Sequence, residues 1–358
     1  DHDVVVVEEH PRPGLPMQCA GLVTDEVVKL SGVRPDILST ILGAEVVFPD
    51  GSALTVRSDR PIARAIDRTD LDSKLADSAV AAEAEFMTST KYRSHSVSDS
   101  VRIDTSSGEV RTRLIVGADG HSSKVAASIP DNAPREYLRG IQADVAVRME
   151  HQDMFRVRLG HDLAPGFFTW EIPCGDYTRV GLCTSWSAGP PMDHLRKLLS
   201  INGYEDKVIG MHSGKIPVGG RRRIVSDRLM LIGDAACQVK PVSGGGLFPG
   251  LTAAPLLAEK ASEALESDNL SGRNLGGYAI KCEKAFGSEL RNGYRLRRMF
   301  VRMSDDDLDA AGRFASRDDV RILLDGIDID HPSKVVGGLL RHPGAMFAAV
   351  PVIMRCLV

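Results

Sequence analysis

The sequence predicts an α/β (α+β) fold in which a Rossmann-like, nucleotide-binding part is interrupted by an antiparallel sheet and followed by helices. Three observations support this prediction. The apolar run Val4–Val7 ends in the acids Glu8 and Glu9, as the second strand of a nucleotide-binding sheet often does. Two later apolar strands run into tight turns, in LIVGADG and LMLIGDAA. Between them, residues 140–185 read as four alternating strands, GIQADVAVRM, MFRVRLG, GFFTWEIP and TRVGLCTS.

Composition indicates an ordinary globular protein. The chain has 358 residues, of which 43% are hydrophobic and 26% charged, enough for one large or two ordinary domains. Its net charge of −4 argues against a nucleic-acid partner, because no excess of positive charge is present to neutralise phosphates. The six cysteines form no CxxC pair and no metal-ligand spacing, which favours a reducing, cytoplasmic context. No apolar run is long enough to span a bilayer, and no signal peptide is recognisable.

Local signals define the elements of the first third. Residues 24–31 read as a helix, and residues 43–57 as a β-hairpin whose turn is Asp50-Gly51. A helix is expected to begin at Thr69 as its N-cap, since leucines and alanines then follow at helical spacing. Residues 91–113 alternate and break at Ser107-Gly108, which predicts a second hairpin.

The order of the remaining elements predicts the domain organisation. A helix at residues 191–204 follows the antiparallel strands, and residues 274–358 are mostly helical in pattern. The nucleotide-type segments therefore stand on both sides of the antiparallel sheet in sequence. We expect a discontinuous cofactor domain of residues 1–35, 61–135 and 221–270, a substrate domain of residues 36–60 and 136–220, and a helical region of residues 271–358.

The segment LMLIGDAACQVKPVSGGGL carries the strongest ligand signal. A buried strand ends at Gly233, which permits a tight turn, and this places Asp234 at the carboxyl end of a central strand. A carboxylate there suits the hydroxyls of a sugar or ribityl chain. Gly245 and Gly246 precede a long helix beginning near Leu247, whose N-terminal amides can approach a phosphate or a cofactor ring. The alternative is a purely structural turn between strand and helix.

Together with LIVGADGHSS, this segment resembles the flavoprotein superfamily of aromatic hydroxylases and geranylgeranyl reductases, which bind FAD. The resemblance covers nearly the whole chain. It implies that Asp119 and Gly120 lie near the cofactor pyrophosphate and that Asp234 contacts the ribityl chain. Arg68, which opens RTDLDSKLADSA, matches the family's Arg-x-x-Leu/Phe-Asp helix start and would face the flavin diphosphate; the alternative is a solvated arginine.

The stretch FFTWEIPCGDYTRVGL is similar to a signature of the geranylgeranyl reductases, with Ile172 where the family usually has Phe. Alternate residues of a strand point to one face, so Phe168, Trp170 and Ile172, followed by Pro173, are expected to form an apolar wall for a polyprenyl chain. The alternative is an ordinary sheet core.

The N-terminal segment resembles the same family. In PMQCAGL, Cys19 and Ala20 match a loop that the family places beside the flavin ring and the substrate alkene, and Cys19 is the candidate proton donor. The alternative is a packed cysteine. Glu8 aligns with the acid that holds the adenosine ribose. The family's opening strand and Gly-x-Gly-x-x-Gly turn precede this segment and are absent here, so the chain as given is expected to hold FAD poorly.

The resemblance implies an FAD-dependent reductase that saturates double bonds in geranylgeranyl chains, in archaeal-type ether phospholipids. Two other interpretations remain: a flavin monooxygenase of an aromatic substrate, and a non-catalytic prenyl-lipid carrier on the same fold. The electron donor stays open between a nicotinamide, ferredoxin and a deazaflavin. The apolar tail HPGAMFAAVPVIMRCLV is too short to span a bilayer, but it could lie on a membrane surface or pack on the protein.

Overall fold

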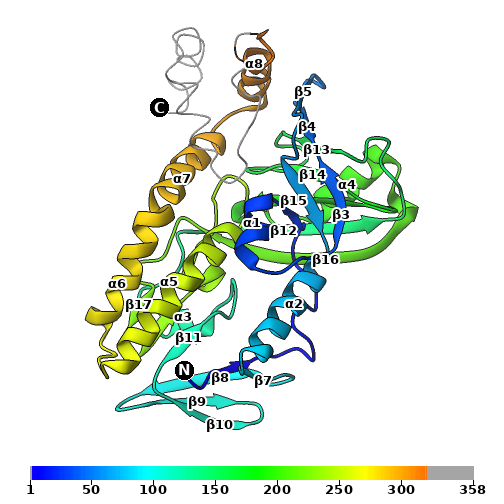
Figure 1. The fold of residues 1–358 in the computed structure, drawn as a ribbon. Helices are drawn as coiled ribbons and strands as arrows, with labels where there is room; N and C mark the ends of the chain where they lie inside the picture. Colours follow the sequence, from blue (N-terminus) through cyan, green and yellow to red (C-terminus); the bar gives the residue numbers. More distant parts are fainter. Residues whose placement is uncertain (1, 319, 321–358) are drawn as a thin grey trace.

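The computed structural model describes residues 2–318 and 320. In this part of the chain the strands form five sheets, and helices lie on both sides of the strands that carry the predicted turns. Figure 1 shows a large antiparallel sheet in one half of the molecule, with the helices of residues 247–300 stacked beside it in the other half. The mixed α/β fold class predicted from the sequence is confirmed.

The large sheet has seven strands in the order β16-β12-β15-β14-β13-β4-β5, antiparallel except where β13 pairs with β4. The four strands expected in residues 140–185 and the hairpin with its Asp50-Gly51 turn are present. The predicted helix of residues 191–204 covers one face of β12 and β15. The elements are β4 (Gly43–Val47), β5 (Ala53–Arg57), β12 (Glu136–Val145), β13 (Met154–Arg158), β14 (Thr169–Cys174), β15 (Tyr177–Ser185), α4 (Met192–Asn202) and β16 (Val208–Val218).

A small sheet in the order β2-β6-β3 lies against the large sheet. Its strands are β2 (Leu22–Val23), β3 (Ile37–Ile41) and β6 (Ala63–Ile66), and β3 and β6 lie against β14. Helix α1 (Asp25–Ser31) follows β2 and begins at the Thr24 cap, close to the predicted start. The loop that contains Cys19 leads directly into β2 and is thereby held beside the large sheet.

The remaining strands form three further sheets. The parallel pairs are β1 with β7 and β11 with β18, and the last strand also pairs with β17. Residues 92–112 form a three-stranded meander, one strand more than the predicted hairpin, although the turn at Ser107-Gly108 is confirmed. The elements are β1 (Val5–Val7), β7 (Glu85–Met87), β8 (Tyr92–Val97), β9 (Val101–Thr105), β10 (Gly108–Thr112), β11 (Ile115–Gly117), β17 (Val225–Ser226) and β18 (Leu229–Leu231).

The valine strand is exposed at its start: Val4 and Val5 are exposed, and among the described residues β1 pairs with β7 alone. One expectation for these elements was wrong in detail. Helix α2 (Arg68–Ala81) starts before Thr69, since the Asp67 carboxylate accepts hydrogen bonds from the Thr69 and Asp70 amides and is the N-cap. Arg68 is therefore the first residue of the helix.

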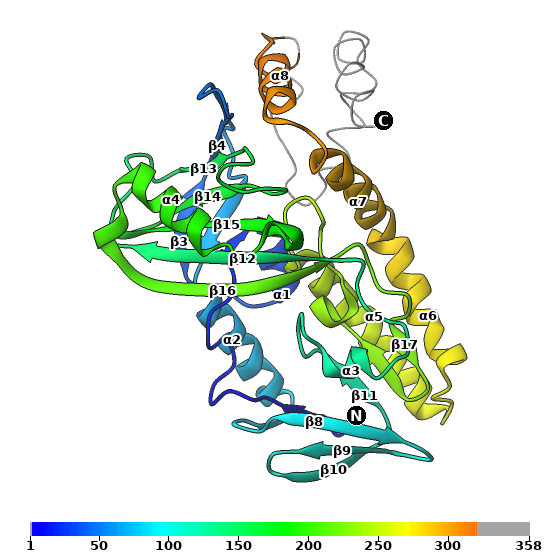
Figure 2. The same cartoon turned by 180° about the vertical axis from the view of Figure 1, so that it is seen from behind.

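The helices after the Gly-Asp turn form a layer over β17 and β18 (Figure 2). Helix α5 (Leu247–Glu266) packs on α6 (Gly272–Cys282), and a π-helical turn (Glu283–Gly287) connects α6 to α7 (Ser288–Phe300). Helix α8 (Asp305–Ala315) lies against β5. The remaining short elements are α3 (Lys124–Ala127) and the 3-10 turns η1 (Trp186–Ala188), η2 (Glu205–Lys207) and η3 (Gly233–Ala236).

The helical pattern predicted for residues 274–358 is observed as far as the structure describes the chain, and the apolar tail of residues 342–358 lies outside the described residues. Among residues 2–318 and 320, no helix combines the length and apolar character needed to cross a membrane.

Candidate functional site

The Cys19 loop is fixed to the large sheet by hydrogen bonds to its backbone carbonyls. The Gln142 amide nitrogen donates to the Cys19 carbonyl at 3.1 Å, and the Arg179 guanidinium donates to the Ala20 carbonyl at 3.0 Å. The loop then turns at Gly21, whose φ of +72° and close neighbours exclude a side chain: a Cβ there would lie 2.7 Å from the Ile66 carbonyl oxygen. The glycine at position 21 therefore allows the loop to turn close against β6, and the two hydrogen-bonded carbonyls restrict its backbone conformation.

Arg179 is the centre of this attachment. Its side chain is buried on β15, where Nε donates to Asp144 at 2.9 Å and Nη2 donates to the Tyr177 hydroxyl at 2.9 Å. Burial alone would lower the pKa of the Arg179 guanidinium, but the Asp144 carboxylate raises it above its usual value. The cation consequently stays charged, and each of its three nitrogens donates a hydrogen bond within the protein.

Sequence reasoning missed Gln142, Asp144 and Arg179. A polar residue at a buried position of a strand with alternating polarity could have indicated them. In β15 the sequence shows no such alternation, because both faces of the strand are buried.

Arg68 lies between the Cys19 loop and the Gly-Asp turn. Its Nη2 donates to both oxygens of Asp72 at 2.9 and 3.0 Å, one turn further along α2. Burial would lower the pKa of Arg68, but the nearby Cys19 thiol and the Asp72 carboxylate raise it, so the guanidinium is firmly charged. Its Nε is buried without a hydrogen-bond partner in the described part of the chain. The Arg68 side chain therefore carries one buried N–H donor that no described residue pairs with.

Asp234 is the second group at this point. Part of its surface is accessible, but protein atoms surround its carboxyl group, and this burial raises the pKa to about 6; the Arg68 guanidinium offsets only part of the effect. Gly233, immediately before it, adopts φ +63° with open space where a side chain would be. The turn thus places a largely buried carboxyl group just after the carboxyl end of β18.

The glycine-rich loop and the start of α5 lie against Asp234. A Cβ on Gly246 would lie 2.9 Å from the Asp234 Oδ1 atom, so only glycine allows this approach. Gly246 is the N-cap of α5 and makes no side-chain cap hydrogen bond, while the Gly245 carbonyl oxygen accepts a hydrogen bond from the Lys240 amide at 3.0 Å. Helix α5 therefore begins beside Asp234 with a glycine, which supplies no capping side chain, at its N-cap.

Asp119 and Gly120 are placed differently from Asp234. The Asp119 carboxylate accepts hydrogen bonds from the Ser123 hydroxyl and from the amides of Lys124 at 2.7 Å and Val125 at 3.1 Å, so it caps α3. Gly120 has φ +71° and open space beside it. The predicted place of both residues near a pyrophosphate stays a prediction, with Asp119 acting through the turn it stabilises.

Glu8 ends β1 and is half-buried. Its Oε1 accepts hydrogen bonds from the His10 amide and the His10 ring nitrogen Nδ1, both at 2.8 Å. Glu9 is exposed and forms an ion pair with Lys91 at 2.6 Å. The ribose-binding role of Glu8 stays a prediction.

The predicted apolar wall is present in part. Phe168 and Trp170 pack in one apolar cluster with Leu138, Val218 and Val239, and both remain half-buried. Ile172 and Pro173 are fully buried, and Ile172 packs in a second cluster that includes Ala20 and Trp170. Of the four residues predicted for the wall, only Phe168 and Trp170 are partly exposed. Ile172 is buried and packs in the cluster that contains Ala20 of the Cys19 loop.

The residues brought together here fit a flavin nucleotide. A buried donor without a partner on Arg68, a carboxyl group on Asp234 and an uncapped helix start at Leu247 are the groups that a phosphate, a ribityl chain and a cofactor ring require. The half-buried Trp170 packs in the apolar cluster that contains Ala20, next to Cys19. Phe168 packs with Trp170 in the neighbouring cluster.

Comparison with known proteins supports this interpretation. A family model described as an FAD binding domain matches residues 32–272. Digeranylgeranylglycerophospholipid reductase 2 of Methanothermobacter thermautotrophicus is 30% identical over 351 residues, which cover 93% of this chain and 88% of that protein. The digeranylgeranylglycerophospholipid reductase of Methanothrix thermoacetophila is 28% identical over 341 residues, covering 88% of this chain and 86% of the relative.

Among solved structures, a geranylgeranyl bacteriochlorophyll reductase-like protein from Thermoplasma acidophilum has a TM-score of 0.84 to this chain. The likeness covers 98% of this chain and 93% of the other, at 18% sequence identity. At this identity the comparison shows a shared fold.

Proposed function

Because the chain belongs to the FAD-binding flavoprotein family that includes the archaeal digeranylgeranylglycerophospholipid reductases, we propose that it saturates geranylgeranyl chains of ether phospholipids, with FAD as its cofactor. The observation that carries the proposal is the position of Cys19. Its loop is attached to the large sheet by Gln142 and Arg179, with Arg68 on one side and the Trp170 cluster on the other.

Each group has a defined task in this proposal. FAD bound here would, in its reduced form, supply the hydride for one carbon of the alkene. Arg68, Asp234 and the start of α5 bind and orient the cofactor. Phe168 and Trp170 position the isoprenoid and exclude water, which an alkene without a neighbouring carbonyl requires.

Cys19 is the proposed proton donor to the second alkene carbon. Loss of the proton leaves a thiolate at Sγ, and the neighbouring Arg68 cation stabilises that charge. The attachment of the Cys19 and Ala20 carbonyls keeps the thiol at a constant place during the transfer.

The test is reduction of a digeranylgeranyl phospholipid by FAD-loaded protein, kept anaerobic and reduced with dithionite. The expected result is a mass increase of two hydrogens for each saturated double bond. Lipid recovered unchanged, from protein whose absorption spectrum shows bound flavin, contradicts the reductase and favours the carrier. Oxygen incorporation into an aromatic acid, with NAD(P)H consumed, favours the monooxygenase.

A Cys19→Ala variant tests the proton donor separately. We expect turnover to fall about 100-fold, because a positioned general acid contributes roughly this much, while the flavin spectrum is retained. Cys183→Ala is the control, since Cys183 is a buried cysteine on β15 of the large sheet, whereas Cys19 lies in the loop attached to that sheet. Unchanged turnover of Cys19→Ala would assign Cys19 to packing alone.

A further inference from the structure

The Gly-Asp turn is closed by the side chain of Gln238. The Gly233 amide donates to the Gln238 oxygen Oε1 at 2.8 Å, and the Gln238 amide donates back to the Gly233 carbonyl at 3.0 Å. Both backbone groups of Gly233 are thereby paired with one residue. Because Asp234 directly follows Gly233, this pairing constrains the backbone that carries the Asp234 carboxyl group.

A chain of hydrogen bonds continues from Gln238 into helix α6. The Gln238 nitrogen Nε2 donates to the Tyr278 hydroxyl at 2.9 Å and to the Cys282 sulfur at 3.7 Å. The Tyr278 hydroxyl donates in turn to the carbonyl of Leu231, the last residue of β18, at 3.0 Å. Burial raises the pKa of Tyr278, so its hydroxyl stays a donor. The strand end and the turn after it are consequently held by the same two side chains.

These polar groups lie inside an apolar core. Gln238, Tyr278 and Cys282 are all buried, and Tyr278 belongs to the cluster that packs α5 and α6 on β18. A buried neutral hydrogen bond adds little net stability, because it replaces a hydrogen bond to water. It does impose direction, since its strength falls steeply away from a linear geometry. The chain is therefore better suited to orienting the turn than to stabilising the core.

Helix α5 confines Asp234 from another side. A Cβ on Gly246 would lie 2.9 Å from the Asp234 Oδ1 atom, and the start of α5 packs against the turn. Asp234 thus stands between α5 and the hydrogen-bonded chain that leads to α6. A rotation of the turn would move its carboxyl group away from both the start of α5 and the Arg68 guanidinium.

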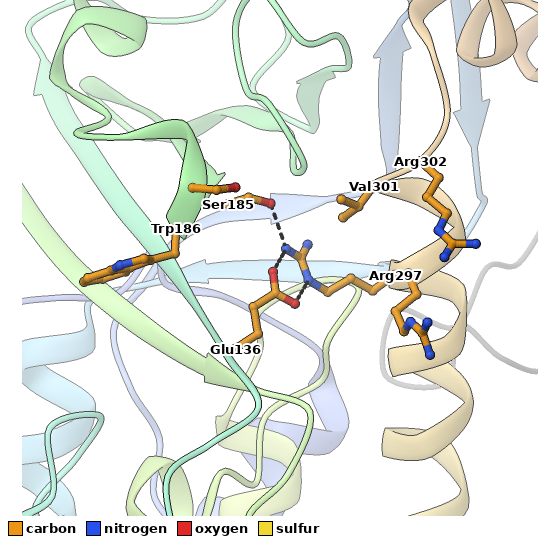
Figure 3. A pocket seen from close by; sticks show the side chains of 8 residues that line it. Glu136, Ser185, Trp186, Arg297, Val301 and Arg302 are labelled. Atoms are coloured by element: carbon orange, nitrogen blue, oxygen red, sulfur yellow. Dashed lines mark hydrogen bonds and ion pairs between the residues drawn. The ribbon is translucent and has the colours of Figure 1, made fainter.

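Helix α6 is itself a fixed support. It continues through the π-helical turn into α7, which Arg297 anchors on the large sheet. Figure 3 shows the Arg297 guanidinium between Glu136 and Ser185, beside a pocket of about 450 Å³. Its Nε donates to Glu136 at 3.1 Å, and its Nη2 donates to the Ser185 hydroxyl at 3.2 Å. The helical layer that contains Tyr278 is therefore attached both to β18 and to the large sheet.

We propose that Gln238 and Tyr278 are positioning residues for the cofactor. They set the orientation of the Gly233-Asp234 turn and, through it, the place at which the Asp234 carboxyl group meets the flavin. Neither side chain touches the ligand, because both act through the backbone of the turn. The inference rests on the proposed function for the identity of that ligand.

The experiment is a double-mutant cycle on FAD affinity, measured by fluorescence titration, with Tyr278→Phe and Asp234→Ala. Tyr278→Phe removes only the hydroxyl, and we expect FAD affinity to fall about 10-fold. In the Asp234→Ala background the same substitution should change FAD affinity less than about 2-fold, because the carboxyl group that the turn positions is absent. The same loss in both backgrounds, or no loss in either, would overturn the proposal.

Two further variants separate positioning from general destabilisation. Gln238→Leu should lower FAD affinity at least as much as Tyr278→Phe, since it leaves the Gly233 amide unpaired. Thr105→Val is the matched control, because the buried Thr105 hydroxyl donates to the Gly108 carbonyl at 2.7 Å in the meander of residues 92–112. It should lower stability and leave FAD affinity unchanged. Equal losses of FAD affinity in Thr105→Val and Tyr278→Phe would contradict a positioning role.

A measurement without flavin separates this inference from the proposed function. In the flavin-free protein, hydrogen–deuterium exchange of residues 229–238 should be faster in Tyr278→Phe than in the unchanged protein, because the turn opens more readily. Equal exchange would refute the positioning role whatever the protein binds. Absence of FAD binding by the unchanged protein would contradict the proposed function itself, whereas FAD binding with an additive cycle would contradict the positioning role alone.

Discussion

The two sides of the candidate site differ in how completely their polar groups are paired. On the sheet side, the polar groups are buried or half-buried and paired. Gln142 donates to the Cys19 carbonyl, and Arg179 donates to both the Asp144 carboxylate and the Ala20 carbonyl. On the cofactor side, Arg68 has a buried donor without a partner in the described residues, and Asp234 is a carboxyl group whose pKa is raised by burial.

This difference shows on which side the buried polar groups are already paired in the free protein. A buried polar group without a partner costs roughly 1–3 kcal/mol, and a bound ligand that supplies the partner recovers that free energy. The sheet side therefore fixes the position of the Cys19 loop in the free protein, whereas on the proposed cofactor side a bound flavin would supply partners that the protein itself lacks. Variants on the two sides should accordingly change different quantities.

The largest expected effect is on the sheet side, from Arg179→Leu. Removing this cation leaves the Asp144 carboxylate and the Ala20 carbonyl without their main donor, and breaking a buried pair in this way costs about 3–5 kcal/mol. Denaturant unfolding should show this loss in the flavin-free protein. Arg111→Leu removes an exposed arginine paired with Glu109 on β10, and it should change stability by less than about 1 kcal/mol.

A double variant distinguishes a lost pair from a general packing defect. In Arg179→Leu/Asp144→Leu the uncompensated carboxylate is gone, so much of the lost stability should return. If the double variant is no more stable than Arg179→Leu, the cost arises from packing, and the sheet side is not organised by this ion pair.

The next effect is on the cofactor side and depends on pH. The folded protein holds the pKa of Asp234 at about 6, against an ordinary 3.8, so the native state keeps a proton that the unfolded chain releases. Stability is therefore lost as the pH rises from about 4 to above 6, by up to about 3 kcal/mol in the flavin-free protein. Asp234→Asn cannot ionise and should not show this loss.

The measurement is the free energy of unfolding of both proteins from pH 4 to pH 7. The two curves should lie close together at pH 4 and diverge toward pH 7, with Asp234→Asn the more stable. Parallel curves would mean that the Asp234 carboxyl group is well solvated and that the cofactor side is not destabilised without its ligand.

Much of the fold follows from local sequence signals. The Asp50-Gly51 turn, the alternating strands of residues 140–185 and the long helix after Gly246 are each encoded within a few residues. The strand β16 was not predicted, although VIGMHSGKIPV alternates between more and less exposed positions in the structure. Its small and polar residues weaken the hydrophobic alternation, so only its pairing with β12 makes it a strand.

The candidate site was predictable where a turn defines a residue's position, as for Asp234 after Gly233 and Arg68 at the start of α2. The attachment of the Cys19 loop was not, because Gln142 and Arg179 are more than 120 residues away in sequence. The cap formed by Asp67 in place of Thr69 shows the same limit at short range, since both residue types suit an N-cap and only the path of the chain decides.

A smaller effect is expected from Arg68→Gln, and it concerns the cofactor rather than stability. The variant removes the cation proposed to face the diphosphate, so FAD affinity should fall about 10- to 100-fold, or roughly 1.4–2.7 kcal/mol. FAD fluorescence titration measures this directly. Arg64→Gln is the control, because Arg64 lies four residues earlier and pairs with the exposed Asp25 at 2.7 Å. Unchanged FAD affinity in Arg68→Gln would show that Arg68 does not bind the cofactor and interacts with Asp72 and Cys19 only.

The smallest effect tests whether the sheet side positions Cys19 or merely supports it. Gln142→Leu removes a single neutral hydrogen bond to the Cys19 carbonyl, which should cost about 1 kcal/mol of stability. With the loop less constrained, the Cys19 thiol should react severalfold faster with a thiol reagent, and turnover should fall without a change in FAD affinity. Gln152→Leu removes the same kind of bond, from a glutamine amide to the Met149 carbonyl, in another loop, and should change stability alone. Equal thiol reactivity in the two variants would show that Gln142 does not hold Cys19 in place, and the attachment would then rest on Arg179.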